Sequence, residues 1–305
     1  NHVITSLVEH KATLNTCKYL NGELYSNNDP TTSLFGEKKK VDRGYEASFV
    51  GVNSDGEIDI DEIASQIKEN TALISMIYVN NEVGTRSDVK SVSKLCQNNN
   101  IAFHSDLTQA LGKMKIDVKK MGIDYASCSA HKIYGPKGIG AAFMKSDAYG
   151  IAPITAFMHG GEQEFGLRAG THAVHNIVGF GKAAEIAFRD LKKNEEHIKN
   201  LDNMLLKGIA NIDEIHTTVN PSKRIPGIIS LVVDKSDFHN ERFIKKISDE
   251  VALSTGSACS AGEPSYVIQA LGLENKVTKV LRVSINKYTT ENDIGAFVKL
   301  LKEEI

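Results

Sequence analysis

The chain has 305 residues, of which 41% are hydrophobic and 24% are charged, and its formal net charge is −2 at pH 7. This balance gives no sign of a general nucleic-acid or membrane surface, and no stretch approaches the roughly 18 consecutive apolar residues of a membrane span. The start lacks a secretory signal pattern, and the spacing of Cys17, Cys96, Cys128 and Cys259 argues against disulfides and against zinc. We therefore expect reduced thiols, no metal, no membrane contact, no direct nucleic acid binding and a cytoplasmic location.

The first half of the chain alternates helical and extended hydrophobic patterns. The expected elements are a helix at 61–68, a strand at 72–79, a helix at 89–97, and strands at 101–104, 125–129 and 140–145. Strands that alternate with helices favour parallel pairing, because each helix returns the chain to the same edge of the sheet. The pattern therefore predicts an α/β fold with a mostly parallel central sheet and helices on both faces.

The second half begins with a long helical pattern and then changes character. The expected elements are a helix from 174 to about 209, a strand at 225–233, helices at 240–248 and 265–271, and a strand at 280–285. A last helix is expected to start at Thr290, because Thr290 and Asp293 form a capping-box pattern. We expect a larger domain over 1–194 and a smaller α+β domain over 195–305.

Two residues with the chemistry of a cofactor site stand at the ends of predicted strands. Asp106 ends the run at 101–106, and Lys132 follows the strand at 125–129. Open α/β sheets bind ligands at the carboxyl ends of parallel strands. A pyridoxal phosphate enzyme needs an amine that forms a Schiff base and a carboxylate that keeps the pyridinium nitrogen protonated. The amine must be unprotonated to react, which burial or a cationic neighbour favours.

Several motifs in one order resemble those of the cysteine desulfurases, in the class V aminotransferase superfamily. They are EHKA (9–12), NNEVGT (80–85), SDLTQ (105–109), SAHK with the tail IYGPKG (129–138), GLRAGT (166–171), STGSAC (254–259) and LRVS (281–284). Motifs that are weak alone become a strong signal as an ordered set. The resemblance implies the fold type I of pyridoxal-phosphate-dependent transferases, with the small domain carrying the catalytic cysteine loop.

The resemblance also implies a set of cofactor contacts around Lys132. His10 is similar to a histidine that stacks on the cofactor ring and exchanges protons with the substrate. Asn81 and Gln109 match side chains that hydrogen-bond the phenolate oxygen of the cofactor. Ser129 and His131 match contacts to its phosphate. The cofactor implied is pyridoxal 5′-phosphate, with Asp106 on its ring nitrogen.

The implied reaction converts L-cysteine to L-alanine and leaves a persulfide on Cys259, the nucleophile, for a sulfur-acceptor protein. Arg282, together with Asn81, would bind the substrate, since an arginine can clamp its carboxylate bidentately. Thr171 matches a residue given to the phosphate of the neighbouring subunit, which implies a homodimer. The acceptor pathway stays open among iron-sulfur assembly, tRNA thiolation and DNA phosphorothioation.

Two other functions and three departures from the family pattern accompany this prediction. The alternatives are a selenocysteine lyase-like enzyme and a non-catalytic scaffold that has lost the phosphate-binding loop. The scaffold is considered because the chain opens almost on His10, so the preceding family segment, with its phosphate loop, is expected to be missing. Residues 19–47 are expected to form a surface insertion. The spacer at 260–262 after Cys259 is shorter than in many members.

Overall fold

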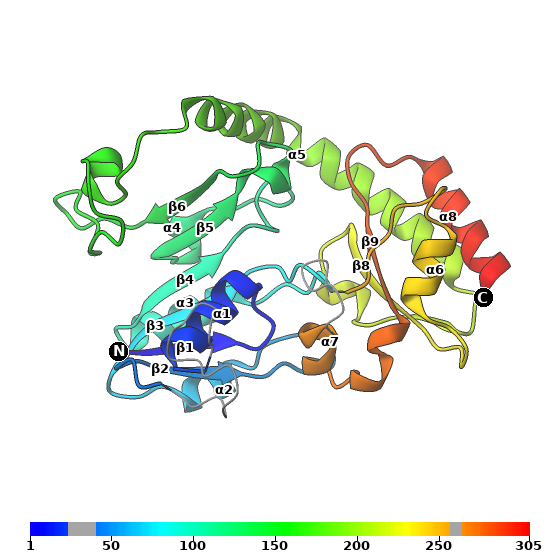
Figure 1. The fold of residues 1–305 in the computed structure, drawn as a ribbon, viewed down its shortest axis with the longest axis horizontal. Coiled ribbons are helices and arrows are strands. Elements are labelled where there is room, and N and C mark those ends of the chain that lie inside the picture. Colours follow the sequence, from blue (N-terminus) through cyan, green and yellow to red (C-terminus); the bar gives the residue numbers. More distant parts are fainter. Residues whose placement is uncertain (24–40, 257–263) are drawn as a thin grey trace, which may run out of the picture.

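The computed structural model describes residues 1–23, 41–256 and 264–305, and the strands of these residues form two separate sheets (Figure 1). In the larger sheet, the six described strands have the order β2-β1-β3-β4-β5-β6. Their bounds are β1 His2–Ser6, β2 Glu46–Val50, β3 Thr71–Ile77, β4 Ala102–Asp106, β5 Tyr125–Ser129 and β6 Gly140–Met144. All neighbours pair in parallel except β6, which is antiparallel to β5. The predicted α/β fold with a mostly parallel sheet is confirmed.

Short helices connect the parallel strands. They are α1 Lys11–Leu20, α2 Ile60–Ser65, α3 Val89–Asn98 and α4 Val118–Met121. Asp59, Asp88 and Asp117 begin α2, α3 and α4, because each carboxylate accepts a hydrogen bond from a free amide of the first turn. These caps fix where each connection leaves its loop.

The strands of the larger sheet present chemically different side chains on their two faces. Along β3, Ile74 and Met76 are fully buried in a hydrophobic cluster that also includes residues of α2, α3 and α4. The intervening Leu73, Ser75 and Ile77 line a cavity on the opposite face. Because side chains alternate along a strand, one sheet supports both an apolar core and a polar site.

The second sheet is antiparallel, with the order β7-β8-β9, and helices cover it. Its strands are β7 Ile215–Thr217, β8 Ile228–Val233 and β9 Val280–Ser284, and its helices are α6 Asn240–Lys246, α7 Tyr266–Ala270 and α8 Glu291–Glu304. The long helix α5 Val174–Ile209 runs from the end of the larger sheet near β6 to the second sheet, where it lies beside α8 (Figure 1). Short 3₁₀-helices occur at η1 Ala130–Ile133, η2 Gln163–Gly166, η3 Pro221–Lys223 and η4 Glu274–Lys279.

The element boundaries differ from the prediction where tertiary contacts intervene. The strand expected at 225–233 begins at Ile228, because Arg224 forms an isolated bridge with Thr85 and Ile225 N donates to Gly84 O. Gly84 has a φ of +78°, and a Cβ there would lie 2.8 Å from Ile228 O, so this contact requires glycine. The predicted strand 125–129 and helix 174–209 match β5 and α5. The elements β1, α1, β2, α4 and β7 were not predicted.

The expected insertion at 19–47 is narrower than predicted. Helix α1 continues to Leu20 and β2 already begins at Glu46. Gly22 O accepts a hydrogen bond from Val41 N at 3.2 Å, so the chain leaves and returns at nearly the same place. Residues 24–40 lie outside the described part. No helix of the described residues is both long enough and apolar enough to cross a bilayer.

Candidate active site

A cavity of about 1060 Å³ lies at the carboxyl ends of the parallel strands. The last residues of three strands line it: Ile77 of β3, Asp106 of β4 and Ser129 of β5. Residues of α1, η1 and β9 complete its walls. This is the edge where an open α/β sheet binds ligands, as the sequence predicted.

Asp106 and Gln109 enter the cavity from the turn after β4. Asp106 Oδ1 accepts a hydrogen bond from Thr108 N at 2.8 Å, which closes a tight turn at the strand end. Both side chains are buried and line the cavity. A buried carboxylate at this position can stabilise a neighbouring positive charge on a ligand.

Lys132 and its neighbours enter from the 3₁₀-helix η1, which follows β5 directly. Ser129 ends the strand, and its hydroxyl makes no cap hydrogen bond to η1. Lys132 and His131 are exposed residues whose side chains line the cavity. Burial and the positive charges of Lys132 and Lys137 lower the pKa of His131. The site therefore places an accessible amine and a neutral imidazole on the same short turn.

His10 faces the cavity from the start of α1. It is the N-cap residue, and Ala12 N donates to its Nδ1 at 3.2 Å. An acceptor role for Nδ1 places the proton of the neutral ring on Nε2. The backbone thus orients His10 while Nε2 is left for a ligand.

Arg282 and Asn81 face the cavity from the other side. Arg282 Nε donates to Ser254 Oγ at 3.1 Å, and Nη1 donates to Asn81 O at 3.2 Å and to Gly256 O at 3.3 Å. No described residue accepts a hydrogen bond from Nη2. The hydrogen bonds of Nε and Nη1 therefore hold the guanidinium in place, and Nη2 remains as a donor for an anion.

A row of hydrogen-bonded polar side chains lies across the cavity face of the sheet. Ser75 Oγ and His104 Nδ1 are 2.8 Å apart, and His104 Nε2 and Ser127 Oγ are 3.1 Å apart. Burial lowers the pKa of His104. Because both ring nitrogens have partners, His104 supports the site floor rather than acting on a ligand.

Two buried glutamates adjoin the site. In the sequence, only their position next to predicted site residues pointed to them. Burial, and to a smaller extent the charge of Asp106, raises the pKa of Glu9 to about 8. Burial likewise raises the pKa of Glu82 to about 7, and its Oε2 accepts a hydrogen bond from Ser265 Oγ at 2.6 Å. Glu9 precedes His10 and Glu82 follows Asn81, but one sequence does not reveal their burial. Lys113, which also lines the cavity, was missed as well.

Two predicted site residues are not among those that line the cavity. Thr171 is exposed on the segment before α5 and lies outside the cavity of its own chain. Cys259 lies outside the described residues, but both ends of its segment are placed. Gly256 contacts Arg282, and Ser265 contacts Glu82, so the segment begins and ends beside the cavity.

Burial raises the thiol pKa of the other three cysteines, of which Cys17 and Cys128 line the cavity. Cys17 and Cys96 are buried, and burial raises their thiol pKa values to about 11 and about 12. Cys128 is half-buried, and burial also raises its pKa. Raised thiol pKa values leave little thiolate at neutral pH, so these three thiols are weak nucleophiles.

Comparison with known proteins gives similarities along nearly the whole chain. Residues 31–297 match the family model for aminotransferase class-V. The cysteine desulfurase IscS of Buchnera aphidicola subsp. Baizongia pistaciae is 38% identical over 308 residues, covering 100% of this chain and 70% of that protein. A solved NifS-like protein has a TM-score of 0.83 and 30% identity, covering 99% of this chain and 74% of its own. SspA in complex with cysteine has a TM-score of 0.74 and 30% identity, covering 95% and 74%.

Proposed function

Because this chain belongs to the aminotransferase class-V family, we propose that it is a pyridoxal-phosphate-dependent cysteine desulfurase that takes sulfur from L-cysteine onto Cys259. The observation that carries the proposal is the convergence of Lys132, Asp106 and Arg282 on one cavity. These three come from separate elements, η1, β4 and β9. Together they offer an amine, a carboxylate and a guanidinium to one ligand.

The polar groups of the cavity fit pyridoxal phosphate. Asn81 Oδ1 is a buried atom without a hydrogen-bond partner in the described chain. No described residue accepts a hydrogen bond from Gln109 Nε2, and the Ser129 hydroxyl makes no cap bond. Since buried polar atoms normally have partners, the Asn81 oxygen supports a polar ligand in the cavity, which the Gln109 and Ser129 side chains also line.

We expect Lys132 to hold the cofactor through its amine and Asp106 to hold the ring nitrogen. Ser129 and His131 would contact the phosphate. When bound, pyridoxal phosphate supplies an electron sink for the carbon atoms of the amino acid. Asp106 supports that chemistry because a buried carboxylate favours a protonated ring nitrogen.

The substrate groups follow from the remaining side chains. Arg282, with Asn81 beside it, would bind the carboxylate of L-cysteine, since Nη2 has no acceptor in the described chain. That SspA was solved with cysteine supports this choice of substrate. His10 would exchange a proton with the bound amino acid through Nε2. The thiolate of Cys259 would attack the substrate sulfur, so that an S–S bond forms, the C–S bond breaks, and the carbon takes a proton to leave as L-alanine.

A sulfur-acceptor protein must then collect the sulfur from Cys259. Iron-sulfur assembly, tRNA thiolation and DNA phosphorothioation are the proposed destinations. The cysteines that the structure describes are unpaired, which fits a reducing compartment such as the cytoplasm.

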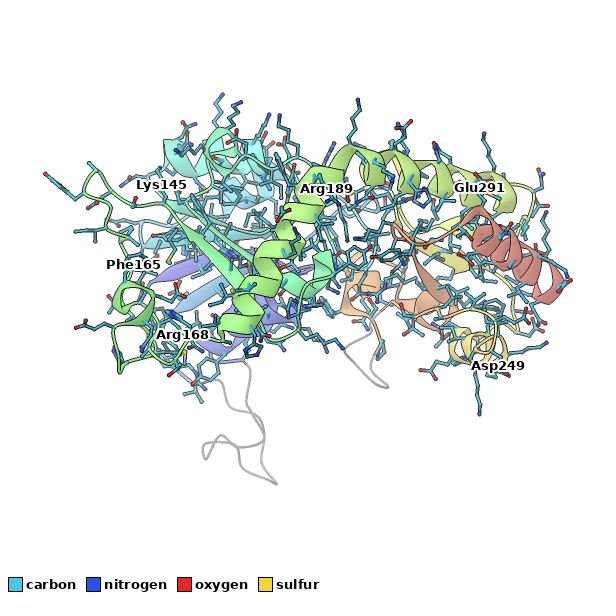
Figure 2. The ribbon with its side chains drawn as sticks, turned by 90° about the horizontal axis from the view of Figure 1, so that it is seen from above. Lys145, Phe165, Arg168, Arg189, Asp249 and Glu291 are labelled. Carbon is cyan, nitrogen blue, oxygen red and sulfur yellow. The ribbon has the colours of Figure 1, made fainter. Side chains whose placement is uncertain are left out.

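An exposed apolar surface near α5 supports a homodimer. Phe165, Phe157 and Phe188 are 100%, 94% and 84% exposed. Figure 2 shows Phe165 and Arg168 on the segment that precedes α5. Large apolar side chains this exposed indicate a protein-protein contact. Because Thr171 lies on the same segment, a second copy that covers this surface could receive Thr171 in its own cavity.

Product analysis tests the proposal. Protein loaded with pyridoxal phosphate should form L-alanine from L-cysteine and a persulfide on Cys259. Lys132→Ala should lose the borohydride-trapped cofactor, and Cys259→Ala should keep it but lose alanine formation from L-cysteine. Lys145→Ala, at an exposed lysine that does not line the cavity, is the matched control and should behave as wild type. No alanine, or full activity in Cys259→Ala, would contradict the proposal; full activity with selenocysteine alone would favour a lyase.

A further inference from the structure

Lys113 lines the cavity, although no motif assigned it a role. It stands four residues after Gln109 in a run of tight turns, in which Leu111 N donates to Leu107 O. Side chains at this spacing leave the same side of such a turn. Accordingly, Lys113 Nζ donates a hydrogen bond to Gln109 Oε1 at 2.5 Å.

The surroundings of Lys113 are unfavourable for an ordinary surface lysine. Burial, together with the nearby cation Lys132, lowers the pKa of its ammonium to about 8. No described carboxylate forms an ion pair with it. The same cavity is lined by Asp106, Arg224 and Glu195, but these do not perturb the pKa of Lys113. A desolvated ammonium without a counter-charge is costly, so its retention indicates a role toward a negative group.

The contact with Lys113 fixes the orientation of the side-chain amide of Gln109. An ammonium can only donate, so it selects the oxygen of the amide, Oε1. The amide nitrogen, Nε2, is then the end left for a ligand, and no described residue accepts its hydrogen bond. Gln109 is buried and borders the cavity beside Asp106.

We propose that Lys113 is a positioning residue for the cofactor, an inference that rests on the proposed function. By holding Gln109 Oε1, it presents the Nε2 donor to the phenolate oxygen of bound pyridoxal phosphate, and its charge favours that anion. An unanchored Gln109 could rotate and present its oxygen, which would repel the phenolate.

The test is a pH titration of the visible absorption of the cofactor-loaded protein. Loss of a nearby cation favours the more protonated form of the chromophore, so Lys113→Met should raise the absorption midpoint by about one pH unit. Lys113→Arg keeps a charged donor and should stay within about 0.3 units of wild type. Lys115→Met, which removes an exposed lysine two residues away, should not shift the midpoint.

A double variant shows whether Lys113 acts through Gln109. In a Gln109→Leu background, Lys113→Met should shift the midpoint by about half as much or less, because the part that acts through Gln109 is gone and only the direct effect of the charge remains. A full additional shift there, an unshifted Lys113→Met, or a Lys113→Arg shifted as far as Lys113→Met would overturn the role. If Lys113→Met does not fold, Lys113→Gln should give a midpoint shift of the same sign. Wild type that never acquires visible absorption would instead overturn the proposed function itself.

Discussion

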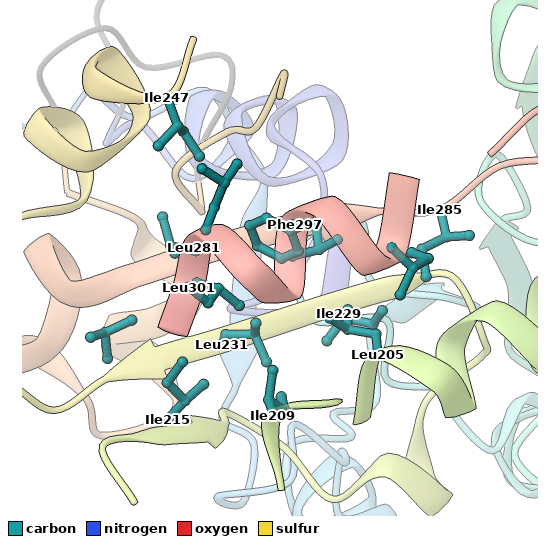
Figure 3. Close-up of a cluster of buried hydrophobic side chains, with 14 of the residues drawn as sticks. Leu205, Ile209, Ile215, Ile229, Leu231, Ile247, Leu281, Ile285, Phe297 and Leu301 are labelled. Carbon is teal, nitrogen blue, oxygen red and sulfur yellow. The ribbon is translucent and has the colours of Figure 1, made fainter. Parts of the chain in front are cut away.

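The second sheet and the cavity face of the larger sheet bury different kinds of side chain. The second sheet packs Leu205 of α5, Leu231 of β8 and Leu281 of β9 into an apolar cluster (Figure 3). The cavity face of the larger sheet instead buries polar groups such as Asp106 and Glu9. Apolar burial stabilises a fold, whereas buried titratable groups cost free energy unless they are paired. We therefore expect the apolar cluster of the second sheet to contribute to stability, and the cavity face of the larger sheet to contribute mainly to chemistry.

Truncation in the apolar cluster should have the largest effect on stability. Leu205→Ala removes a side chain that is 0% exposed, so we expect the free energy of unfolding to fall by about 2–5 kcal/mol. Met204→Ala, one residue earlier on α5 and 37% exposed, is the control and should change it by less than about 1 kcal/mol. Urea unfolding followed by circular dichroism measures both. Equal losses would show that the interior of the second sheet is not the main source of stability.

Asp106→Asn should slow the reaction and leave the stability of the fold nearly unchanged. The amide can still accept from Thr108 N, so the fold should be retained. It cannot stabilise a protonated ring nitrogen, and we expect alanine formation to slow by about 100-fold, or about 2.7 kcal/mol in the barrier. Asp61→Asn, on the exposed first turn of α2, should leave the rate unchanged. A variant as active as wild type would remove Asp106 from the chemistry.

Much of this fold could be predicted because the spacing of hydrophobic residues along the sequence indicates which side chains are buried. The strand 125–129 and the helix 174–209 were placed correctly by their patterns alone. The predicted start of β8 was wrong because Arg224 forms a bridge with Thr85 and Ile225 N donates to Gly84 O. These contacts join segments far apart in sequence, which no local pattern reveals. The domain division at 194 and 195 stays a prediction.

The site was predictable only where a motif named a residue. Asp106 ends one predicted strand and Lys132 follows another, so the strand pattern placed both at one edge of the sheet. Lys113, Glu9 and Glu82 matter because of burial and of the charges around them. Those properties arise from packing between elements, and the sequence carries no separate signal for them.

Glu9 should make stability depend on pH. Its pKa is about 8 in the folded chain and about 4.3 when unfolded, so between these values the folded state holds a proton that the unfolded state releases. Stability should therefore fall as pH rises, by up to about 1.4 kcal/mol per pH unit. Glu9→Gln keeps an acceptor for Ser6 and Ile77 and should flatten this fall between pH 5 and about 8.

Urea unfolding at several pH values between those limits measures the slope. The exposed Glu69 supplies a matched control, since Glu69→Gln changes the same charge without a buried partner and should keep the slope of wild type. A Glu9→Gln variant as pH-dependent as wild type would mean that other groups carry the proton linkage.

The smallest expected effect on stability is at the N-terminal cap of α8, the helix that packs beside α5. Thr290 Oγ1 accepts from Asp293 N at 3.2 Å, and the side chain of Asp293 accepts from Thr290 N in return. Thr290→Ala leaves the first-turn amide without its acceptor and should lower the free energy of unfolding by about 1 kcal/mol. Thr278→Ala, at an exposed threonine of η4, is the control. Alanine formation should stay unchanged in both, so a slower Thr290→Ala enzyme would show that α8 influences the cavity as well as the apolar cluster.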